Sequence, residues 1–221
     1  MTENSENNVQ TKLFQTFKFW FTFFKKREKQ VDEFEENLKE IGLISTAEEF
    51  WGIYQHMKRP SSLHRGCEFF LFKKDVKPMW EDPANHGGGR FIISFKKLAT
   101  NNKIWEDILI SFIMIDNSYD HLNGVVLNVK NQEIHISVWT KNLTSELQEK
   151  TLQWIKSNIE SPVEMLIEYK KHPTPEEMNE MQNFNTKENE PKEKPLTENG
   201  LSFKNSNKDV LKEETKHPLS E

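Results

Sequence analysis

The segment Pro78-Met79-Trp80-Glu81-Asp82 combines residue types that could bind a flat, positively charged ligand. It places an indole directly beside a carboxylate between two expected strands, and ligand-binding residues are often carried on such loops. One carboxylate can accept two parallel N–H donors, which guanine presents on its pairing edge. The Trp80 face would add stacking and cation–π energy of about 1 to 3 kcal/mol for guanine made cationic by N7-methylation. A packed loop Trp beside a solvated Glu is the other interpretation, and these residues alone leave both open.

Other residue combinations in the chain give little indication of catalysis. The sequence has no GxSxG, HExxH or paired CxxC motif, and its 7 His are scattered rather than set at metal-ligand spacings. Gly87-Gly88-Gly89 lacks the Gly-Lys-Ser/Thr of a phosphate-binding loop, which favours a turn. The single cysteine, Cys67, has no partner for an internal disulfide and is typical of a small buried residue. We therefore expect a binding protein that is not an enzyme and holds no cofactor or metal.

Length and charge favour one folded domain with polar ends. Residues 174–221 hold 7 Lys against 11 Asp and Glu, and residues 1–12 hold two Glu and one Lys. With a formal net charge of −5 for the chain, the central part is close to neutral. A large basic face for nucleic acid is therefore disfavoured. We expect a disordered segment at 1–12, a domain at 13–173 and a disordered charged tail at 174–221.

One apolar run, Leu13 to Phe24, is the only stretch that resembles a membrane segment. It is about twelve residues long and contains Lys18, whereas a spanning helix needs roughly 20 apolar residues. No signal peptide precedes it. We expect a cytoplasmic protein without membrane contact.

The elements that must position these residues follow from hydrophobic periodicity. Strands are expected at Leu13–Phe24, Glu68–Phe72, Arg90–Phe95, Asn123–Lys130, Glu133–Thr140 and Val163–Tyr169. Helices are expected at 45–57, 103–115 and 144–158. This order predicts an α+β domain with a mainly antiparallel sheet and its helices on one side.

The expected helix at 45–57 carries an aromatic residue of special interest. Ser45-Thr46 followed by Glu48 and Glu49 is typical of a helix N-terminus, because a hydroxyl can accept from early backbone N–H groups and carboxylates favour the positive end of the dipole. The buried face is expected to consist of Phe50, Ile53, Tyr54 and Met57. Trp51 lies about 100° from Phe50 around the helix axis, beside that face. It could be a partly exposed partner-binding aromatic or could cover a second packed layer.

Several distinctive blocks lie in order between residues 14 and 172. They include EENLKEIG at 35–42, EFW at 49–51, KPMWEDPAN at 77–85, GGR at 88–90, GVV at 124–126 and EYK at 168–170. Together these blocks resemble the cap-binding translation initiation factor 4E family, and are most similar to its 4E homologous protein (type 2) branch. The resemblance implies a curved eight-stranded antiparallel sheet. Three helices would cover its convex face, and the concave face would hold the 7-methylguanosine cap of mRNA.

The resemblance also implies roles for individual residues. The implied cap-binding residues are Phe34 and Trp80 for stacking, Glu81 for the guanine edge, Trp139 for the methyl group, and Arg90 and Lys130 for the phosphates. Phe34 stands where the family usually has Trp and the branch commonly Tyr, and Lys130 stands where Arg is usual. A phenyl ring is a poorer stacking surface than an indole, and Lys lacks the bidentate fork of Arg. We therefore expect cap affinity below that of a standard initiation factor.

On the convex face, Trp51 matches the indole with which the family binds short helical motifs of scaffold or repressor proteins. Glu106 and Leu109 match neighbouring partner-binding positions. The resulting hypothesis is a cap-binding translation factor that recruits or blocks initiation partners. The alternative is an interaction module with little cap affinity that acts through this face. A cap hydrolase would need a carboxylate cluster or a nucleophile with its base, for which the sequence gives no indication.

Overall fold

One antiparallel sheet organises the protein, and its strands follow the spatial order β2-β1-β3-β5-β6-β4-β7. The computed structural model describes residues 10–23, 31–160, 165–174 and 176–177, all within one unit, Met1–Gln182. The strands of these residues are β1 Lys12–Phe23, β2 Lys39–Thr46, β3 Cys67–Lys73, β4 Gly89–Lys96, β5 Leu122–Val129, β6 Glu133–Thr140 and β7 Leu166–Lys171. The α-helices are α1 Val31–Asn37, α2 Ala47–Tyr54, α3 Asn102–Ile113 and α4 Ser145–Asn158.

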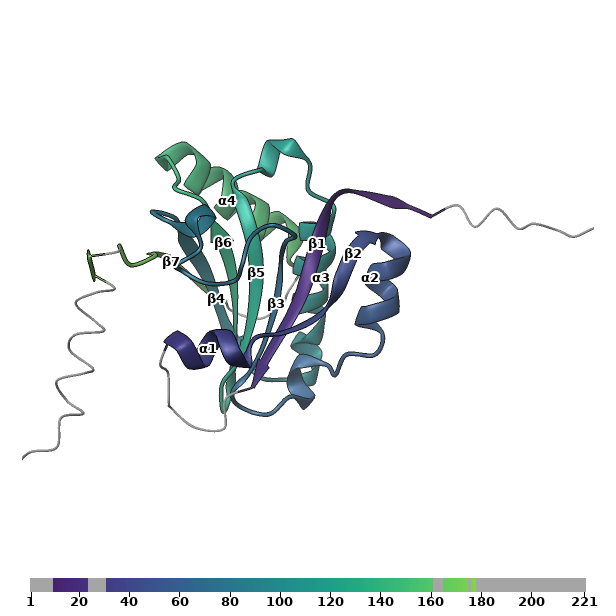
Figure 1. Ribbon diagram of the computed structural model, residues 1–221. Coiled ribbons are helices and arrows are strands. Elements are labelled where there is room, and N and C mark those ends of the chain that lie inside the picture. Colours follow the sequence, from purple (N-terminus) through teal and green to yellow (C-terminus); the bar gives the residue numbers. More distant parts are fainter. Residues whose placement is uncertain (1–9, 24–30, 161–164, 175, 178–221) are drawn as a thin grey trace, which may run out of the picture. The chain divides into compact units, whose positions relative to one another are not determined.

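The main core lies between the sheet and three helices. Alternate β5 residues Val125, Leu127 and Val129 are 0–1% exposed and belong to the same cluster as Phe50 of α2 and Trp154 of α4. Successive side chains of a strand point to opposite faces, so the intervening residues of β5 lie on the other side. We call the side packed against α2, α3 and α4 the helix-covered face, and the other side the open face (Figure 1).

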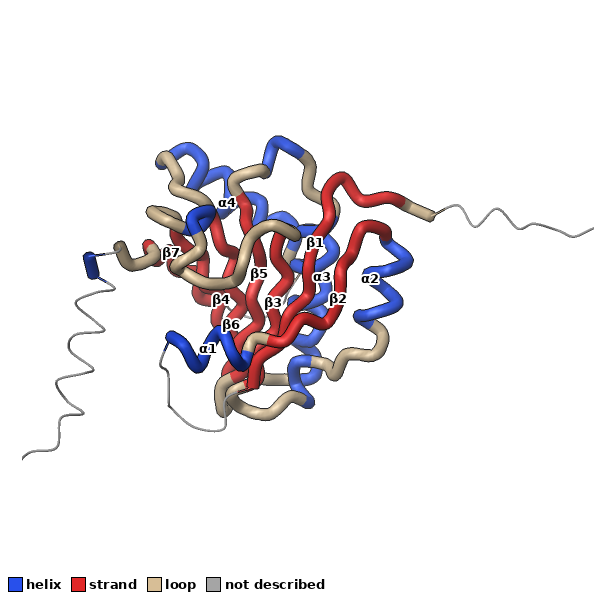
Figure 2. Tube along the Cα trace, in the orientation of Figure 1, coloured by secondary structure: helices blue, strands red, loops and turns tan. Residues whose placement is uncertain are grey.

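A second, smaller apolar cluster lies on the open face. Its buried members are Phe70, Phe72, Val76, Val126 and Trp139, with Trp20, Phe34, Leu38, Trp80 and Ala84 packed against them. Phe34 comes from α1, which Figure 2 shows in front of the sheet, whereas α3 lies behind it. The open face therefore receives one helix of its own.

The α+β class and the antiparallel sheet are confirmed, with differences in the number of elements. The described residues form seven strands rather than the expected eight, and four α-helices rather than three, since α1 lies on the open face. Periodicity missed β2 because Ile41 and Leu43 are exposed while Ile44 is buried, so apolar residues fall on both faces. It missed α1 because seven residues are too few to show a helical repeat.

The local signals were more reliable than the element counts. The strand expected at Glu133–Thr140 is β6, with the same first and last residues. It pairs with β5 to form the expected hairpin. The Thr46 hydroxyl accepts from the Glu49 backbone N–H at 3.1 Å, while the Glu49 carboxylate accepts from the Thr46 backbone N–H at 3.2 Å. This capping box begins α2 as predicted. The helix ends at Tyr54, earlier than expected, and continues as a turn.

The apolar run near the amino terminus is β1, and its residues Phe17 and Phe19 are fully buried in the main core. Among the residues that the structure describes, no helix has the length and apolar character to cross a membrane. Residues 1–9 and 178–221 lie outside the described part, so the disorder expected at both ends remains a prediction. The expected disordered segment 1–12 reaches too far, because Lys12 begins β1 and the Thr11 carbonyl accepts from the Ala47 N–H at 2.9 Å.

Candidate functional site

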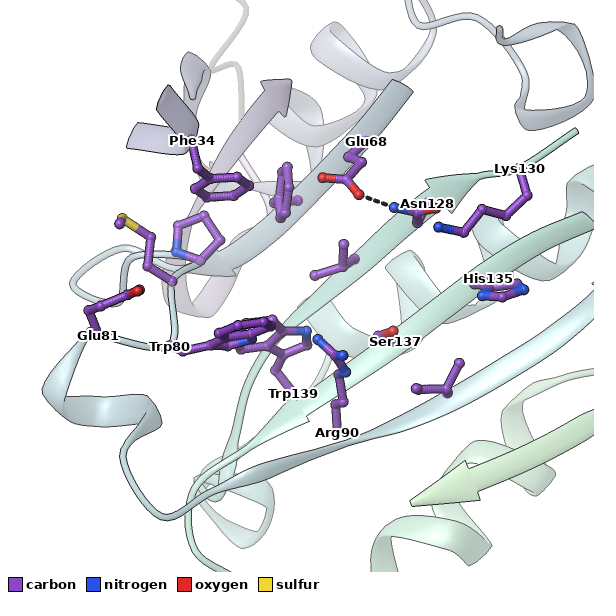
Figure 3. Close-up of a pocket in the computed structure, with 15 residues that line it drawn as sticks. Phe34, Glu68, Trp80, Glu81, Arg90, Asn128, Lys130, His135, Ser137 and Trp139 are labelled. Atoms are coloured by element: carbon purple, nitrogen blue, oxygen red, sulfur yellow. Dashed lines mark hydrogen bonds between the residues drawn. The ribbon is translucent and has the colours of Figure 1, made fainter. Parts of the chain in front are cut away.

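A cavity of about 370 Å³ opens on the open face of the sheet. The six residues expected at a cap site all line it, namely Phe34, Trp80, Glu81, Arg90, Lys130 and Trp139 (Figure 3). They come from α1, from the segment between β3 and β4, and from β4, β6 and the β5–β6 turn. The fold thus brings together residues that are far apart along the chain.

The mouth of the cavity has an aromatic ring on each of two sides. Phe34 is half-buried, and its ring packs edge-on against Phe70 with 5.9 Å between centroids and 85° between planes. Trp80 is half-buried in the segment that follows β3. Figure 3 shows Phe34 above the cavity and Trp80 below it. A flat ring of the size of a nucleobase could stack in this position.

A third aromatic residue, Trp139 of β6, forms part of the cavity wall and is only 5% exposed. It packs against Phe72 at 5.6 Å and against the His172 ring at 4.3 Å between centroids. Gly124 of β5 makes this packing possible, because a Cβ there would lie 2.3 Å from the Phe72 ring. The indole is therefore supported from behind and exposes little of its surface.

Positive charge lies beside the indoles. The Arg90 guanidinium carbon lies 5.7 Å from the Trp80 ring centroid and 5.8 Å from that of Trp139, both within cation–π range. Burial lowers the pKa of Arg90, and the Glu68 carboxylate acts in the opposite direction. Because a guanidinium is not deprotonated in proteins, the cavity offers a fixed cation to an anionic group.

Glu81 lines the cavity beside its chain neighbour Trp80, at the left of the view in Figure 3. Its side chain is exposed, and its backbone carbonyl lies 3.0 Å from Nε2 of His86. No hydrogen bond or ion pair joins the Glu81 carboxylate to another residue in the described part of the chain. An exposed carboxylate of this kind can accept hydrogen bonds from a ligand that enters the cavity.

Sequence reasoning missed a polar pair deeper in the cavity. The Asn128 amide of β5 donates to the Glu68 carboxylate of β3, which also accepts from the Thr22 hydroxyl of β1 at 3.5 Å. Both cavity residues share the open face with Val126, so the alternation along β3 and β5 could have placed them there. The carboxylate sets a negative group opposite Arg90, and His135 lies further along the same wall.

The predicted partner-binding residues lie on the helix-covered side and differ from one another in exposure. Trp51 of α2 is 45% exposed. Its ring packs against those of Phe50 and Tyr54, with 5.0 Å and 5.9 Å between ring centroids. Glu106 of α3 forms an ion pair with Arg59 at 2.7 Å.

Leu109 corrects the expectation for this surface. It is fully buried in the main core, because it lies on the side of α3 that packs against the sheet. It supports the surface from below and is not available for direct contact with a partner.

Comparisons with known proteins identify relatives of this chain. The sequence model described as "Eukaryotic initiation factor 4E" matches residues 12–189. The translation initiation factor NCBP of Oryza sativa subsp. japonica is 37% identical over 177 residues, which cover 77% of this chain and 77% of the relative. NCBP of Triticum aestivum is 41% identical over 141 residues, and the match spans 63% of this chain and 60% of the relative's length.

Solved structures of relatives show the same fold. The Ascaris suum protein eIF4E-3, solved with an m7G cap, superposes with a TM-score of 0.67 at 26% identity and covers 75% of this chain and 93% of its own. The C. elegans protein eIF4E-3, solved with the 4E-binding protein Mextli and a cap analog, has a TM-score of 0.66 at 28% identity, with 74% and 94% covered. On the extent of the family match and these similarities, the chain belongs to the eukaryotic initiation factor 4E family.

Proposed function

We propose that this protein is a translation factor that binds the 7-methylguanosine cap of mRNA in the open-face cavity, in the cytoplasm and without catalysing a reaction. The observation that carries the proposal is the placement of Phe34 and Trp80 on opposite sides of one cavity, with Glu81 and Arg90 in the same lining. The solved relative with an m7G cap supports the same ligand for this fold.

In the proposed complex, the methylated base lies between the Phe34 and Trp80 rings. The positive base gains stacking and cation–π energy of about 1 to 3 kcal/mol, which unmethylated guanine gains only in part. The Glu81 carboxylate accepts from the two N–H donors of the pairing edge. Trp139 lies near the methyl group, and Arg90 and Lys130 bind the phosphates.

We further propose that this protein binds the cap less tightly than a relative with an indole in place of Phe34. A phenyl face is smaller and less electron-rich than an indole face, so both the stacking and the cation–π energy fall. Lys130 offers a point charge rather than the planar fork of Arg. Among the cations of the lining, Arg90 remains as the bidentate donor to a phosphate.

A partner protein would bind on the other side of the sheet. We propose that exposed Trp51 is the centre of a surface for a short helical motif, with Glu106 at its edge. The C. elegans structure with Mextli supports a protein partner of this kind. Such a partner would either promote or block initiation on the bound mRNA.

The direct test is a fluorescence titration of the purified protein with 7-methyl-GTP and with GTP. We expect saturable quenching with a clear preference for the methylated nucleotide, and loss of that binding in Trp80→Ala. Trp51→Ala is the matched control, because it removes the same side chain from the other face and should leave cap affinity unchanged. Absence of quenching in the wild-type protein at high micromolar nucleotide would refute the proposal and favour the interaction module.

A further inference from the structure

One buried amide side chain, that of Asn85, forms hydrogen bonds with the backbone of the segment that carries Trp80. Asn85 is 0% exposed, and its Nδ2 donates to the Lys77 carbonyl at 2.9 Å and to the Met79 carbonyl at 2.7 Å. The Met79 carbonyl belongs to the peptide group that joins Met79 to Trp80. Fixing that peptide plane restricts the backbone torsion angles that set the direction of the indole.

A second buried amide connects this support to the sheet. Asn123 of β5 is 0% exposed, and its Nδ2 donates to Asn85 Oδ1 at 2.9 Å and to the Ala84 carbonyl at 2.7 Å. Asn123 stands at an irregularity of the strand, since Leu122 pairs with Thr140 and Gly124 with Trp139, which leaves Asn123 unmatched. Bulges of this kind redirect a side chain away from its regular position.

Asn85 also connects the residue that follows the last strand, His172, to the site. The Asn85 backbone carbonyl accepts from the Gly88 N–H at 3.1 Å and lies 3.1 Å from Nδ1 of His172. His172 in turn packs on Trp139 at 4.3 Å between ring centroids. Asn85 therefore contacts groups that support both indoles of the cavity, although it does not itself line the cavity.

We propose that Asn85, held by Asn123, is a positioning residue for cap binding that fixes Trp80 in the orientation needed for stacking. The inference rests on the proposed function, because it explains how the same site keeps its shape before the ligand arrives. When the cavity wall is already ordered, less conformational entropy is lost on ligand binding. The affinity is therefore higher without any additional contact.

The test replaces donors without changing the size of the side chain. Asn85→Asp keeps the shape and one acceptor oxygen but removes the two donors that hold Lys77 and Met79. Asn101→Asp is the matched control, because Asn101 is 2% exposed and donates to the Lys96 carbonyl at 2.9 Å, outside the cavity lining. Each full-length variant is studied well below its own melting temperature, with its folded fraction checked by circular dichroism.

Two measurements are made on each variant. Titration with 7-methyl-GTP should give an affinity about tenfold lower in N85D than in the wild type, and an unchanged affinity in N101D. Hydrogen–deuterium exchange without ligand should show faster exchange across residues 77–82 in N85D only. The exchange measurement reports the order of the segment independently of its function.

The outcomes separate this inference from the proposed function. Equal cap affinities in N85D and wild type, or an equal loss in N101D, would overturn the positioning role while leaving cap binding intact. A wild-type protein that fails to bind 7-methyl-GTP would instead refute the proposed function and, with it, the effect of Asn85 on affinity. In that case unchanged exchange at residues 77–82 in N85D would also exclude Asn85 as a support for the segment.

Discussion

At the scale of single residues, the two stacking positions of the proposed cap site are unequal. Trp80 offers an indole, whereas Phe34 offers a phenyl ring that packs edge-on against Phe70. An indole has a larger and more electron-rich face, which favours a cationic base. The Phe34 position therefore limits how tightly the proposed sandwich can hold its ligand.

Replacing Phe34 with Trp should raise the affinity for 7-methyl-GTP by roughly three- to tenfold, because the gain in cation–π and stacking energy is of the order of 1 kcal/mol. The affinity for GTP should rise less, since unmethylated guanine is neutral. Parallel fluorescence titrations with both nucleotides measure this difference. A variant that binds both nucleotides as the wild type does would place the first stacking ring elsewhere.

On the opposite face, Trp51 combines exposure with a fixed position. Its ring leans on Phe50 and Tyr54, so little conformational entropy is lost when a partner covers it. Trp51→Ala should weaken binding of a synthetic helical peptide from a 4E-binding protein by at least about thirtyfold, the range of an interface hot spot. Isothermal titration measures the loss. Trp80→Ala is the control, and similar peptide binding in wild type and W51A would exclude this surface.

At the scale of elements, the antiparallel pairing of β3 with β5 supports the cavity wall, because it brings Phe72 and Gly124 close together. Gly124 allows the Phe72 ring to lie against the strand, and Phe72 in turn packs on Trp139. A methyl group at this position would lie 2.3 Å from the Phe72 ring, so that ring must move. The support for Trp139 would move with it.

Gly124→Ala should therefore lower the free energy of unfolding by about 1 to 3 kcal/mol, as overpacked cores do. It should also reduce the preference for methylated over unmethylated nucleotide, because Trp139 is the proposed methyl contact. Urea denaturation and paired titrations measure the two effects. An unchanged preference together with lower stability would remove Trp139 from the methyl contact and leave it a purely structural role.

The N-terminus of α2 offers a test that is independent of ligand. Thr46→Ala removes the hydroxyl that accepts from the Glu49 N–H and should cost about 1 kcal/mol of stability. Thr46→Ser keeps the hydroxyl and should recover most of the loss. Urea denaturation of the three proteins measures the difference, and equal midpoints would show that the Thr46 hydroxyl contributes nothing to stability.

At the scale of the whole molecule, buried histidines make stability depend on pH. Burial lowers the pKa of His121 to about 4, with the positive charges of Lys150 and Lys73 acting in the same direction. Its Nε2 lies 2.9 Å from the Thr151 hydroxyl of α4. His172 has a pKa lowered by burial as well.

Between a pKa of about 4 in the folded protein and about 6.5 in the unfolded chain, the unfolded state binds the additional proton of His121. Stability is therefore full above the higher pKa and falls as the pH drops towards the lower one. The free energy of unfolding should decrease by on the order of 1 to 3 kcal/mol between pH 7 and pH 4.

His121→Gln should flatten this pH dependence in part, with the remainder due to His172 and to carboxylates. Urea denaturation at several pH values measures the slopes. Lys141 and Lys73 lower the pKa of Asp120 to about 2. Asp120 therefore changes the free energy of unfolding only below about pH 4, outside the range in which His121 does so. Identical slopes for H121Q and wild type between pH 4 and pH 6.5 would show that His121 titrates normally in the folded state.

Features that depend on neighbours along the chain could be predicted from the amino-acid sequence. The alternation in Glu133–Thr140, the hydroxyl and carboxylate of the α2 capping box and the pairing of an indole with an acid at Trp80-Glu81 all act within a few residues. Such short-range patterns reflect backbone geometry directly. The roles proposed for Phe34 and Lys130, by contrast, rest on resemblance to a family rather than on any local pattern.

Which distant residues share a surface became known from the folded structure. It brought Phe34 of α1 to the cavity of Trp80, buried Leu109, and joined Asn85 to Asn123 across 38 positions of sequence. These contacts depend on strand order and on the irregularity in β5, which set side-chain directions through pairing with other strands. Pairing partners far along the chain leave no periodic signal in the segments that they position, so their effect becomes visible only when the sheet is assembled.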